Sequence, residues 1–458
     1  MQVLYVHQNY PAQFGHMARR LRREKGWQCF YVSQSPAGKD DDIERIQYRL
    51  TGGATNQTHF CSRTFENTIW HCEAVFQALK ARPDVQPDLI VGHSGFGSTL
   101  FLRELYPQAP VLNLFEYYYR PHDPNGDMDF RHDLNWKLDP HKYLRSRCRN
   151  AMILLDLQNC QLGYCPTRFQ TERFPREYQH KLRTVFDGID RQVYHGFTER
   201  LRPAPAQRPP RSIAGVTVPP DTRLVTYVSR SMESMRGFDQ FMRAAKLIYQ
   251  RMPNVLFVVV GEEKVAYGGD EEYLGGQASF KSWVLAQDQY DMSKFLFTGR
   301  LPPEDLAALL ASTDLHIYLT VPFVVSMSMI DAMSCGAVVL GSATTPVKEW
   351  ITDGVNGLLA DFFSPEEFAD KAISVLKDPA AARPLGRAAE DGIAQNYSLN
   401  ATFPSMLKVY EEARSHPATP RNLAQPAETA MPPRNANVIS DAPLLTKIRP
   451  ASRSPFRG

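Results

Sequence analysis

Short apolar runs alternate along the first half of the chain with segments whose apolar residues have helical spacing. Runs of the first kind lie at 3–6, 88–91, 111–115 and 184–186, and the helical pattern lies at 16–25 and 100–105. Strands buried in a parallel sheet have continuous apolar sequences, and amphipathic helices connect them. The alternation therefore predicts a parallel α/β domain.

The same alternation restarts after a segment that contains six prolines and few apolar residues, 198–221. Strands are expected at 224–229, 255–260, 295–297, 315–319 and 337–340, and helices at 238–250, 303–312, 328–335 and 365–376. The proline-rich composition is typical of a linker. We expect two doubly wound, Rossmann-like domains, 1–197 and 222–395, with the linker between them.

The end of the chain has a different composition. A helix is expected at 396–415, packed back on the first domain. The last 43 residues, 416–458, contain eight prolines and one aromatic residue, Phe456. Such a segment buries too little apolar surface to offset the entropy of ordering it, so we expect a disordered tail.

Composition and charge narrow the class of protein. The 458 residues are 43% hydrophobic and 22% charged, and their longest strongly apolar run, 255–260, is too short to span a membrane. The amino terminus has no signal-peptide pattern, and the seven cysteines form no metal-binding spacing. The formal charge of +3 rests on the tail, which carries +4. We therefore expect a cytoplasmic protein that binds no nucleic acid and no metal.

The loops that follow the strands of the second domain carry the candidate chemistry. In an open parallel sheet, ligands bind beyond the carboxyl ends of the strands. Arg230 and Arg236 flank the loop after strand 224–229, and Gly237 lets the backbone approach a ligand closely. Guanidinium groups beside a helix amino terminus suit a phosphate, although two surface arginines would give the same sequence.

Three more loops extend this candidate site. Gly261 and Glu262 follow strand 255–260, while Gly299, Arg300 and Leu301 offer backbone groups to a flat base after strand 295–297. Ser326, Met327 and Ser328 would present free amides at the start of a helix, and an anion would bind there. Asp331 in the same helix would accept two ribose hydroxyls, or would only complement the helix dipole.

Together these residues resemble the donor-binding half of retaining family 4 glycosyltransferases of the GT-B fold. Arg230 and Arg236 have the spacing of the family's Arg-x(5)-Lys pair, and 328–336 resembles the end of its Glu-x(7)-Glu stretch. Residues 346–357, which include Glu349, resemble its Pro-Glu-containing tail. In the first domain, Gly15 occupies the amino-terminal loop and His93 the end of the strand with the active-site histidine. The resemblance implies two domains that face a central cleft.

The chain departs from the family pattern at residues that contact the donor in the family. The first glutamate of Glu-x(7)-Glu, which contacts the donor sugar in the family, is replaced here by Phe323. The second glutamate is Asp331, and the usual lysine is Arg236. The amino-terminal loop has Gly15 without the usual second glycine. Recognition of the donor sugar must therefore differ from the family's.

The resemblance implies a hexosyl transfer with retention from a nucleotide-diphosphate sugar to a glycan, lipid-linked or small-molecule acceptor, as in bacterial polysaccharide or glycoconjugate synthesis. Arg230 and Arg236 would stabilise the leaving diphosphate without a metal or cofactor. His93 would touch the donor sugar or the acceptor, unless it is a satisfied strand-end histidine. The basic helix at 16–25 would rest on the inner membrane surface, or would be a plain solvated face.

Two other functions stay open at this point. One is a sugar-nucleotide epimerase of the same fold, and the other is a sugar-nucleotide-binding protein without turnover, which Phe323 motivates. A nicotinamide dehydrogenase is disfavoured because no Gly-x-Gly-x-x-Gly follows the first strand.

Overall fold

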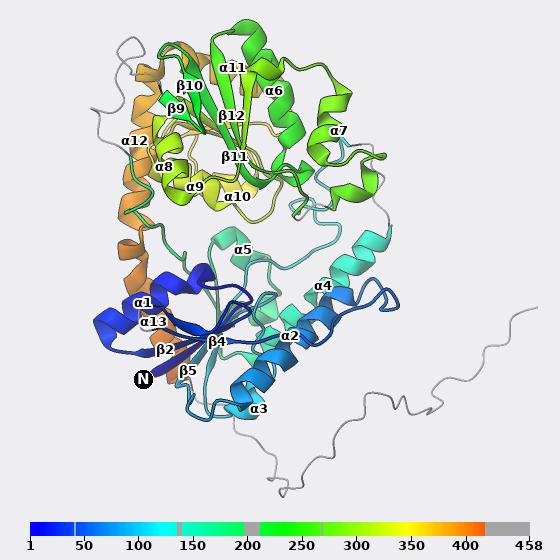
Figure 1. The fold of residues 1–458 in the computed structure, drawn as a ribbon, viewed down its shortest axis with the longest axis vertical. Coiled ribbons are helices and arrows are strands. Elements are labelled where there is room, and N and C mark those ends of the chain that lie inside the picture. The colour runs from blue at the N-terminus through cyan, green and yellow to red at the C-terminus, as the bar shows by residue number, and fades with distance from the viewer. Residues whose placement is uncertain (41–42, 135–139, 197–210, 267–268, 417–458) are drawn as a thin grey trace, which may run out of the picture. The chain divides into compact units, whose positions relative to one another are not determined.

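The computed structural model describes residues 1–40, 43–134, 140–196, 211–266 and 269–416. The amino-terminal residues form the first of its two large sheets (Figure 1). Its strand order is β3-β4-β2-β1-β5-β6-β7-β8, and every neighbouring pair except β3–β4 is parallel. The strands are β1 (Gln2–Val6), β2 (Gln28–Ser33), β3 (Gly38–Asp40), β4 (Ile43–Gln47), β5 (Leu89–His93), β6 (Val111–Leu114), β7 (Leu162–Cys165) and β8 (Leu182–Thr184).

Helices cover both faces of this sheet. They are α1 (Gly15–Lys25), α2 (Arg63–Lys80), α3 (Leu102–Leu105), α4 (Pro140–Asn159) and α5 (Arg168–Glu172), with short 3-10 turns η1 (Ala12–Phe14) and η2 (Arg176–Lys181). Met17 and Leu21 of α1 pack on one face, and Val75 of α2 and Leu157 of α4 pack on the other. This is the doubly wound arrangement that the alternating pattern predicts.

The second sheet has the order β13-β12-β11-β14-β15-β16 and is parallel throughout. Its strands are β11 (Arg223–Ser231), β12 (Val255–Glu262), β13 (Phe295–Gly299), β14 (Leu315–Tyr318), β15 (Val339–Ser342) and β16 (Leu358–Ala360). Its helices are α6 (Phe238–Arg251), α7 (Phe280–Gln287), α8 (Pro303–Ser312), α9 (Met327–Ser334), α10 (Thr345–Lys348), α11 (Pro365–Lys377) and α12 (Pro379–Asn396), with turns η5 (Ser234–Arg236), η6 (Asp270–Tyr273) and η7 (Met292–Lys294). Two such domains confirm the predicted fold class.

The predicted linker is partly structured. Its residues 211–218 belong to a small antiparallel hairpin, β9 (Arg211–Ile213) and β10 (Val216–Val218), and Ile213 and Val218 are buried in the core of the second domain. Residues 198–210 lie outside the described part of the chain. The predicted linker, 198–221, thus includes a hairpin that two apolar residues anchor to the second domain. The predicted tail, 416–458, lies outside the described residues from 417 onward.

The last helix, α13 (Leu399–Ser415), returns to the first domain. Phe403, Met406 and Tyr410 enter the same apolar core as α1 and β1. A bridge between Ile189 and Ser398 holds the start of this helix beside the end of the first domain. The carboxyl-terminal segment therefore completes the amino-terminal core.

A long connection between β6 and α4, residues 116–134, contacts the second domain, and we call it the strap. Arg131 forms an ion pair with Asp239 of α6 at 2.6 Å and donates to the Ser234 carbonyl. The Tyr117 hydroxyl donates to the Pro322 carbonyl at 3.3 Å. The strap thus lies against the loops that hold the candidate donor residues.

Candidate functional site

The loop after β11 and the loop after β14 are joined by one buried guanidinium. Arg236 is 7% exposed, and its Nη1 donates to Thr320 Oγ1 at 2.8 Å and to the Val324 carbonyl at 3.0 Å. Gly237 follows with φ +60°, and a Cβ there would lie 2.7 Å from Leu319 Cβ. The absence of a side chain at Gly237 therefore lets the Arg236 turn sit directly against the β14 loop.

The amino end of α9 is tied to the same guanidinium through a hydroxyl. The Tyr318 hydroxyl accepts a hydrogen bond from Arg236 Nη1 at 3.4 Å and from the Ser326 amide at 2.8 Å. Ser326 caps the helix, because its Oγ accepts from the Ser328 amide at 3.3 Å. Met327 is 46% exposed. The structure therefore brings the guanidinium of Arg236 together with the amino end of α9, at Ser326, Met327 and Ser328. This part of the carboxyl edge of the sheet carries positive charge.

Asp331 lies in the second turn of α9, and the residue is 6% exposed. Burial raises the pKa of its carboxyl to about 8. No donor in the described part of the chain lies within hydrogen-bonding distance of its side-chain oxygens. A buried carboxylate without a protein donor is costly, and hydroxyl groups of a ligand would lower that cost.

The remaining predicted donor loops end β12 and β13. Gly261 has φ +146°, and a Cβ there would lie 2.2 Å from the Ser229 carbonyl oxygen. Glu262 pairs with Lys264 at 2.6 Å, and this hydrogen bond lowers the pKa of the Glu262 carboxyl, with a smaller contribution from the exposed Arg230. Gly299, with φ +68°, turns the chain after β13 toward Arg300 and Leu301.

Glu349 contacts the first domain, and its contact with the donor stays a prediction. Its carboxylate accepts hydrogen bonds from the amides of Arg168 at 2.7 Å and Phe169 at 2.9 Å, and so caps the amino end of α5 in the first domain. The prediction took Glu349 from its place in the family motif, and the structure uses the carboxylate as a contact between domains. Local sequence gives no sign of amides 180 positions away.

Replacing Glu349 should therefore weaken folding more than donor binding. Glu349→Ala removes the acceptor of the two amides at the amino end of α5, and we expect a loss of about 1–2 kcal/mol in the free energy of unfolding. Chemical denaturation measures this loss. Glu411→Ala, at an exposed position of α13, is the matched control and should change stability by less than about 0.5 kcal/mol. Equal effects of the two substitutions would contradict the capping role.

His93 ends β5 and is 1% exposed. Its Nδ1 lies 2.9 Å from the Ser94 carbonyl and its Nε2 lies 3.6 Å from Glu116. Burial lowers the pKa of His93, but the charge and hydrogen bonding of Glu116, the Ser94 carbonyl and the Asp187 charge together outweigh burial and raise the pKa overall. The rings of His7 and Phe96 lie against the imidazole at 5.3 and 5.1 Å. His93 is thus enclosed by two rings and Glu116, and its contact with the donor sugar or the acceptor stays a prediction.

Gly15 serves the packing of the amino-terminal loop. A Cβ at this position would lie 2.3 Å from Pro11 Cβ. Gly15 therefore starts α1 directly against Pro11, and its closeness to a donor stays a prediction.

Phe323, at the position of the family's sugar-contacting glutamate, is buried between the domains. It is 7% exposed and lies 4.5 Å from the Tyr117 ring of the strap. The Arg173 guanidinium lies over the other side of this cluster, 4.7 Å from the Tyr117 ring. An apolar contact between domains thus replaces the glutamate, and sequence analysis missed Tyr117 and Arg173 as its partners.

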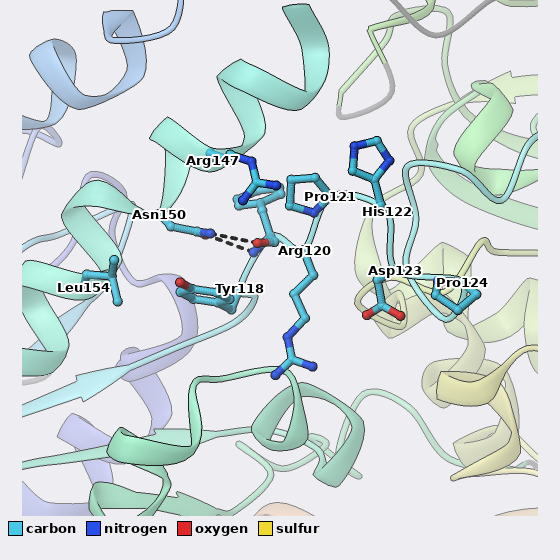
Figure 2. Close-up of a pocket in the computed structure, with 10 residues that line it drawn as sticks. Tyr118, Arg120, Pro121, His122, Asp123, Pro124, Arg147, Asn150 and Leu154 are labelled. Carbon is cyan, nitrogen blue, oxygen red and sulfur yellow. Dashed lines mark hydrogen bonds between the residues drawn. The ribbon is translucent and has the colours of Figure 1, made fainter. Parts of the chain in front are cut away.

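The Asn150 side chain of α4 holds the backbone of the strap. Asn150 accepts from the Tyr119 amide at 3.0 Å and donates to the Tyr119 carbonyl at 2.7 Å, as the dashed lines of Figure 2 show. A hollow of about 550 Å³ lies beside this contact. Arg120 leaves the hollow and donates to the carbonyls of Glu172 and Phe174. Backbone pairing by Asn150 therefore fixes where the strap begins its path to the second domain.

Two family models match the chain. The glycosyl transferase family 4 group matches residues 25–194, and the glycosyl transferases group 1 matches residues 211–392. The chain belongs to these glycosyltransferases, and its two domains have the GT-B fold of the family.

Individual relatives are distant. A D-inositol 3-phosphate glycosyltransferase of Segniliparus rotundus is 26% identical over 42% of this chain and 41% of its own length. An N-acetyl-alpha-D-glucosaminyl L-malate synthase of Bacillus anthracis is 27% identical over 25% of this chain and 29% of its own. The aligned parts thus span well under two thirds of these relatives.

Solved structures match over most of the chain. Sucrose-phosphate synthase from Thermosynechococcus elongatus aligns with a TM-score of 0.65 at 16% identity, over 90% of this chain and 98% of its own. HepE of Anabaena, solved in complex with UDP and glucose, aligns with a TM-score of 0.61 at 14% identity, over 90% of this chain and 100% of its own. At these identities the likeness concerns the fold.

Proposed function

We propose that the protein transfers a hexose from a nucleotide-diphosphate sugar to an acceptor, with retention of the anomeric configuration and without a metal. The observation that carries the proposal is the link from Arg236 through the Tyr318 hydroxyl to the Ser326 amide. It places a guanidinium and a helix amino end together at the carboxyl edge of the sheet, where a diphosphate would be bound.

The donor would lie along this edge. Arg230, Arg236 and the amides of Met327 and Ser328 would stabilise the negative charge that develops on the diphosphate as the sugar bond breaks. Asp331 would accept the ribose hydroxyls, and the base would lie against the turn at 299–301. The departing phosphate would take the proton of the acceptor hydroxyl.

The sugar would be recognised without the family's first glutamate. Phe323 packs against Tyr117, so hydroxyl contacts would come from backbone groups of the 320–326 loop and from the first domain. Because HepE of Anabaena was solved in complex with UDP and glucose, UDP-glucose is the first donor to test.

The class of acceptor is proposed from the family. A glycan or lipid-linked acceptor at the cytoplasmic membrane, as in bacterial polysaccharide synthesis, fits the family. Every helix in the described ranges is too short or too polar to cross a bilayer. Arg19 pairs with Asp40, and Arg20 with Glu24, so two of the cations on α1 have internal partners. This favours a solvated α1 over a membrane-bound one.

The proposal is tested by titrating UDP-, GDP-, ADP- and dTDP-hexoses into the full-length protein by calorimetry, with EDTA present. Slow hydrolysis of the donor that binds should follow and should yield the retained anomer first. Binding without any hydrolysis would instead favour a sugar-nucleotide-binding protein without turnover. The buried Phe323, in place of the family's sugar-contacting glutamate, is the observation that supports this alternative. Conversion of the donor to an epimer, without an acceptor, would identify the epimerase.

A further inference from the structure

We call the site formed by Arg236 and the amino end of α9 the donor cradle. A second hollow adjoins it on the side of the strap. It has a volume of about 430 Å³ and lies between α4, the strap and η6, and we call it the α4 pocket. Ser234 and Met235, which line it, directly precede Arg236. Tyr119, Met128 and Leu134 give it apolar walls. The pocket is therefore next to the cradle, but most of its lining comes from the first domain.

Two arginines of α4 line this pocket. Arg145 and Arg149 are four residues apart, so both project from one face of the helix. The Nε of Arg145 is buried without a hydrogen-bond acceptor in the described part of the chain. Burial lowers the pKa of Arg145, and the charges of Arg149 and Arg63 lower it further. Two like charges in one hollow destabilise the protein unless an anion lies between them.

The acidic residues of the pocket already have partners. Asp270 accepts from the amide and hydroxyl of Ser234 at 2.8 and 2.6 Å, and Asp127 accepts from the Tyr117 hydroxyl at 2.7 Å. Asp129 accepts from the Tyr143 hydroxyl. Glu272 lies 3.8 Å from Lys142. Arg149 rests over the Tyr119 ring, 5.0 Å from its centroid. The charges of Asp127 and Glu272 also act on Arg149 and Arg145, respectively. Among the described residues, however, no carboxylate forms a hydrogen bond or ion pair with either guanidinium, so both can still donate to a ligand.

From this arrangement we infer that the α4 pocket binds a phosphate ester or diphosphate carried by the acceptor, with Arg145 and Arg149 as its ligands. The inference rests on the proposed function, because only a transferase has an acceptor. Guanidinium forks match phosphate oxygens in geometry and charge. The anion would belong to a soluble sugar phosphate or to a lipid-linked diphosphate, which present the same group to the pocket.

The test uses the full-length protein with its donor cradle saturated by UDP. Glucose 1-phosphate and inorganic pyrophosphate are titrated by calorimetry, and phosphatidylcholine vesicles with and without undecaprenyl diphosphate are tested by co-sedimentation. Arg145→Ala/Arg149→Ala should weaken binding of the recognised probe by about tenfold or more, the value of a lost charge-assisted pair. Binding of the soluble probes identifies a sugar phosphate, and binding of the doped vesicles alone identifies a lipid-linked acceptor.

Arg147→Ala is the matched control. Arg147 is on the same helix but lines the other hollow, beside Asn150 (Figure 2), so its loss should change the affinity by less than about twofold. Arg145→Lys/Arg149→Lys keeps the charges and should retain part of the binding, which separates the role in binding from a role in folding.

Two results would overturn the inference: equal affinity of the probes for the wild type and the double alanine variant, or no saturable binding of any probe. A wild type that fails to bind any nucleotide sugar contradicts the proposed function instead. In that case the probes are titrated without UDP, and their loss in the double variant still supports the pocket as an anion site.

Discussion

Arg236→Ala should reduce the rate of transfer by about 10²–10³-fold, the range seen when a group that stabilises developing charge is removed, and it should also weaken binding of the donor nucleotide. In the proposed site this guanidinium faces the diphosphate, and it also holds the loop after β14 through Thr320 and Val324. Its loss would therefore remove a charge and release the loop that begins α9. Calorimetry with the nucleotide and initial rates of donor hydrolysis measure the two effects.

Arg236→Lys separates these two roles. The lysine of the related enzymes keeps the charge at this position, but a single ammonium replaces a planar fork with several donors. We expect Arg236→Lys to lose about tenfold in nucleotide affinity while its melting temperature falls toward that of Arg236→Ala. Arg243→Ala, at an exposed position of α6, serves as a control for the removal of a nearby positive charge. Wild-type nucleotide affinity in Arg236→Ala would rule out the diphosphate role.

The positions of many elements could be predicted because their causes are local. Helix α8 has the predicted bounds, 303–312, since Pro303 at its start and acidic residues in its first turn fix where it begins. Strand β15 lies two residues beyond the predicted start, at 339 rather than 337. Its position is set by pairing with β14 and β16, which the local apolar run does not reveal.

Helix α4 was harder to predict from the sequence, because its charged residues line two different hollows. Arg145 lines the α4 pocket, while Arg147 lines the hollow beside Asn150. Cations on several sides weaken the apolar stripe that identifies a surface helix. Strand β4, with two charged residues among its five, gives an equally weak signal.

The candidate site, too, could be predicted where its causes are local and not where they depend on distant contacts. The motifs indicated the loops that converge at the edge of the second sheet, because strand ends in a parallel sheet meet there. They gave no sign of the strap, whose Arg131 pairs with Asp239, 108 positions further along the chain. Nor did the motifs show that Phe323 packs on Tyr117. Contacts between distant segments depend on the relative placement of two domains, which no local pattern encodes.

Asp331→Asn should stabilise the unliganded protein while it weakens nucleotide binding. Burial raises the pKa of the Asp331 carboxyl to about 8, above the ordinary value of 3.8, so the folded protein holds this proton more tightly than the unfolded chain does. The stability that the proton provides is complete below pH 3.8 and is lost as the pH rises through 8. Asparagine has no charge to bury, so the variant should escape this loss.

The difference in stability between Asp331→Asn and the wild type should therefore grow with pH. At pH 5 it should be about 1–2 kcal/mol, and near pH 9 it should reach on the order of 5 kcal/mol in favour of the variant, since each of about four pKa units corresponds to about 1.4 kcal/mol. Denaturation curves at several pH values measure this difference. Asp353→Asn, at an exposed position, is the matched control.

Nucleotide binding should reverse the order. If the carboxylate accepts two ribose hydroxyls, UDP relieves its burial and stabilises the wild type more than Asp331→Asn, whose amide has one acceptor oxygen in place of two. The melting temperature of the wild type should then rise more with UDP, and the affinity of the variant should fall by about 10- to 100-fold. A variant that is stabilised at high pH but binds UDP as the wild type does would show that Asp331 is buried for a reason other than the ribose.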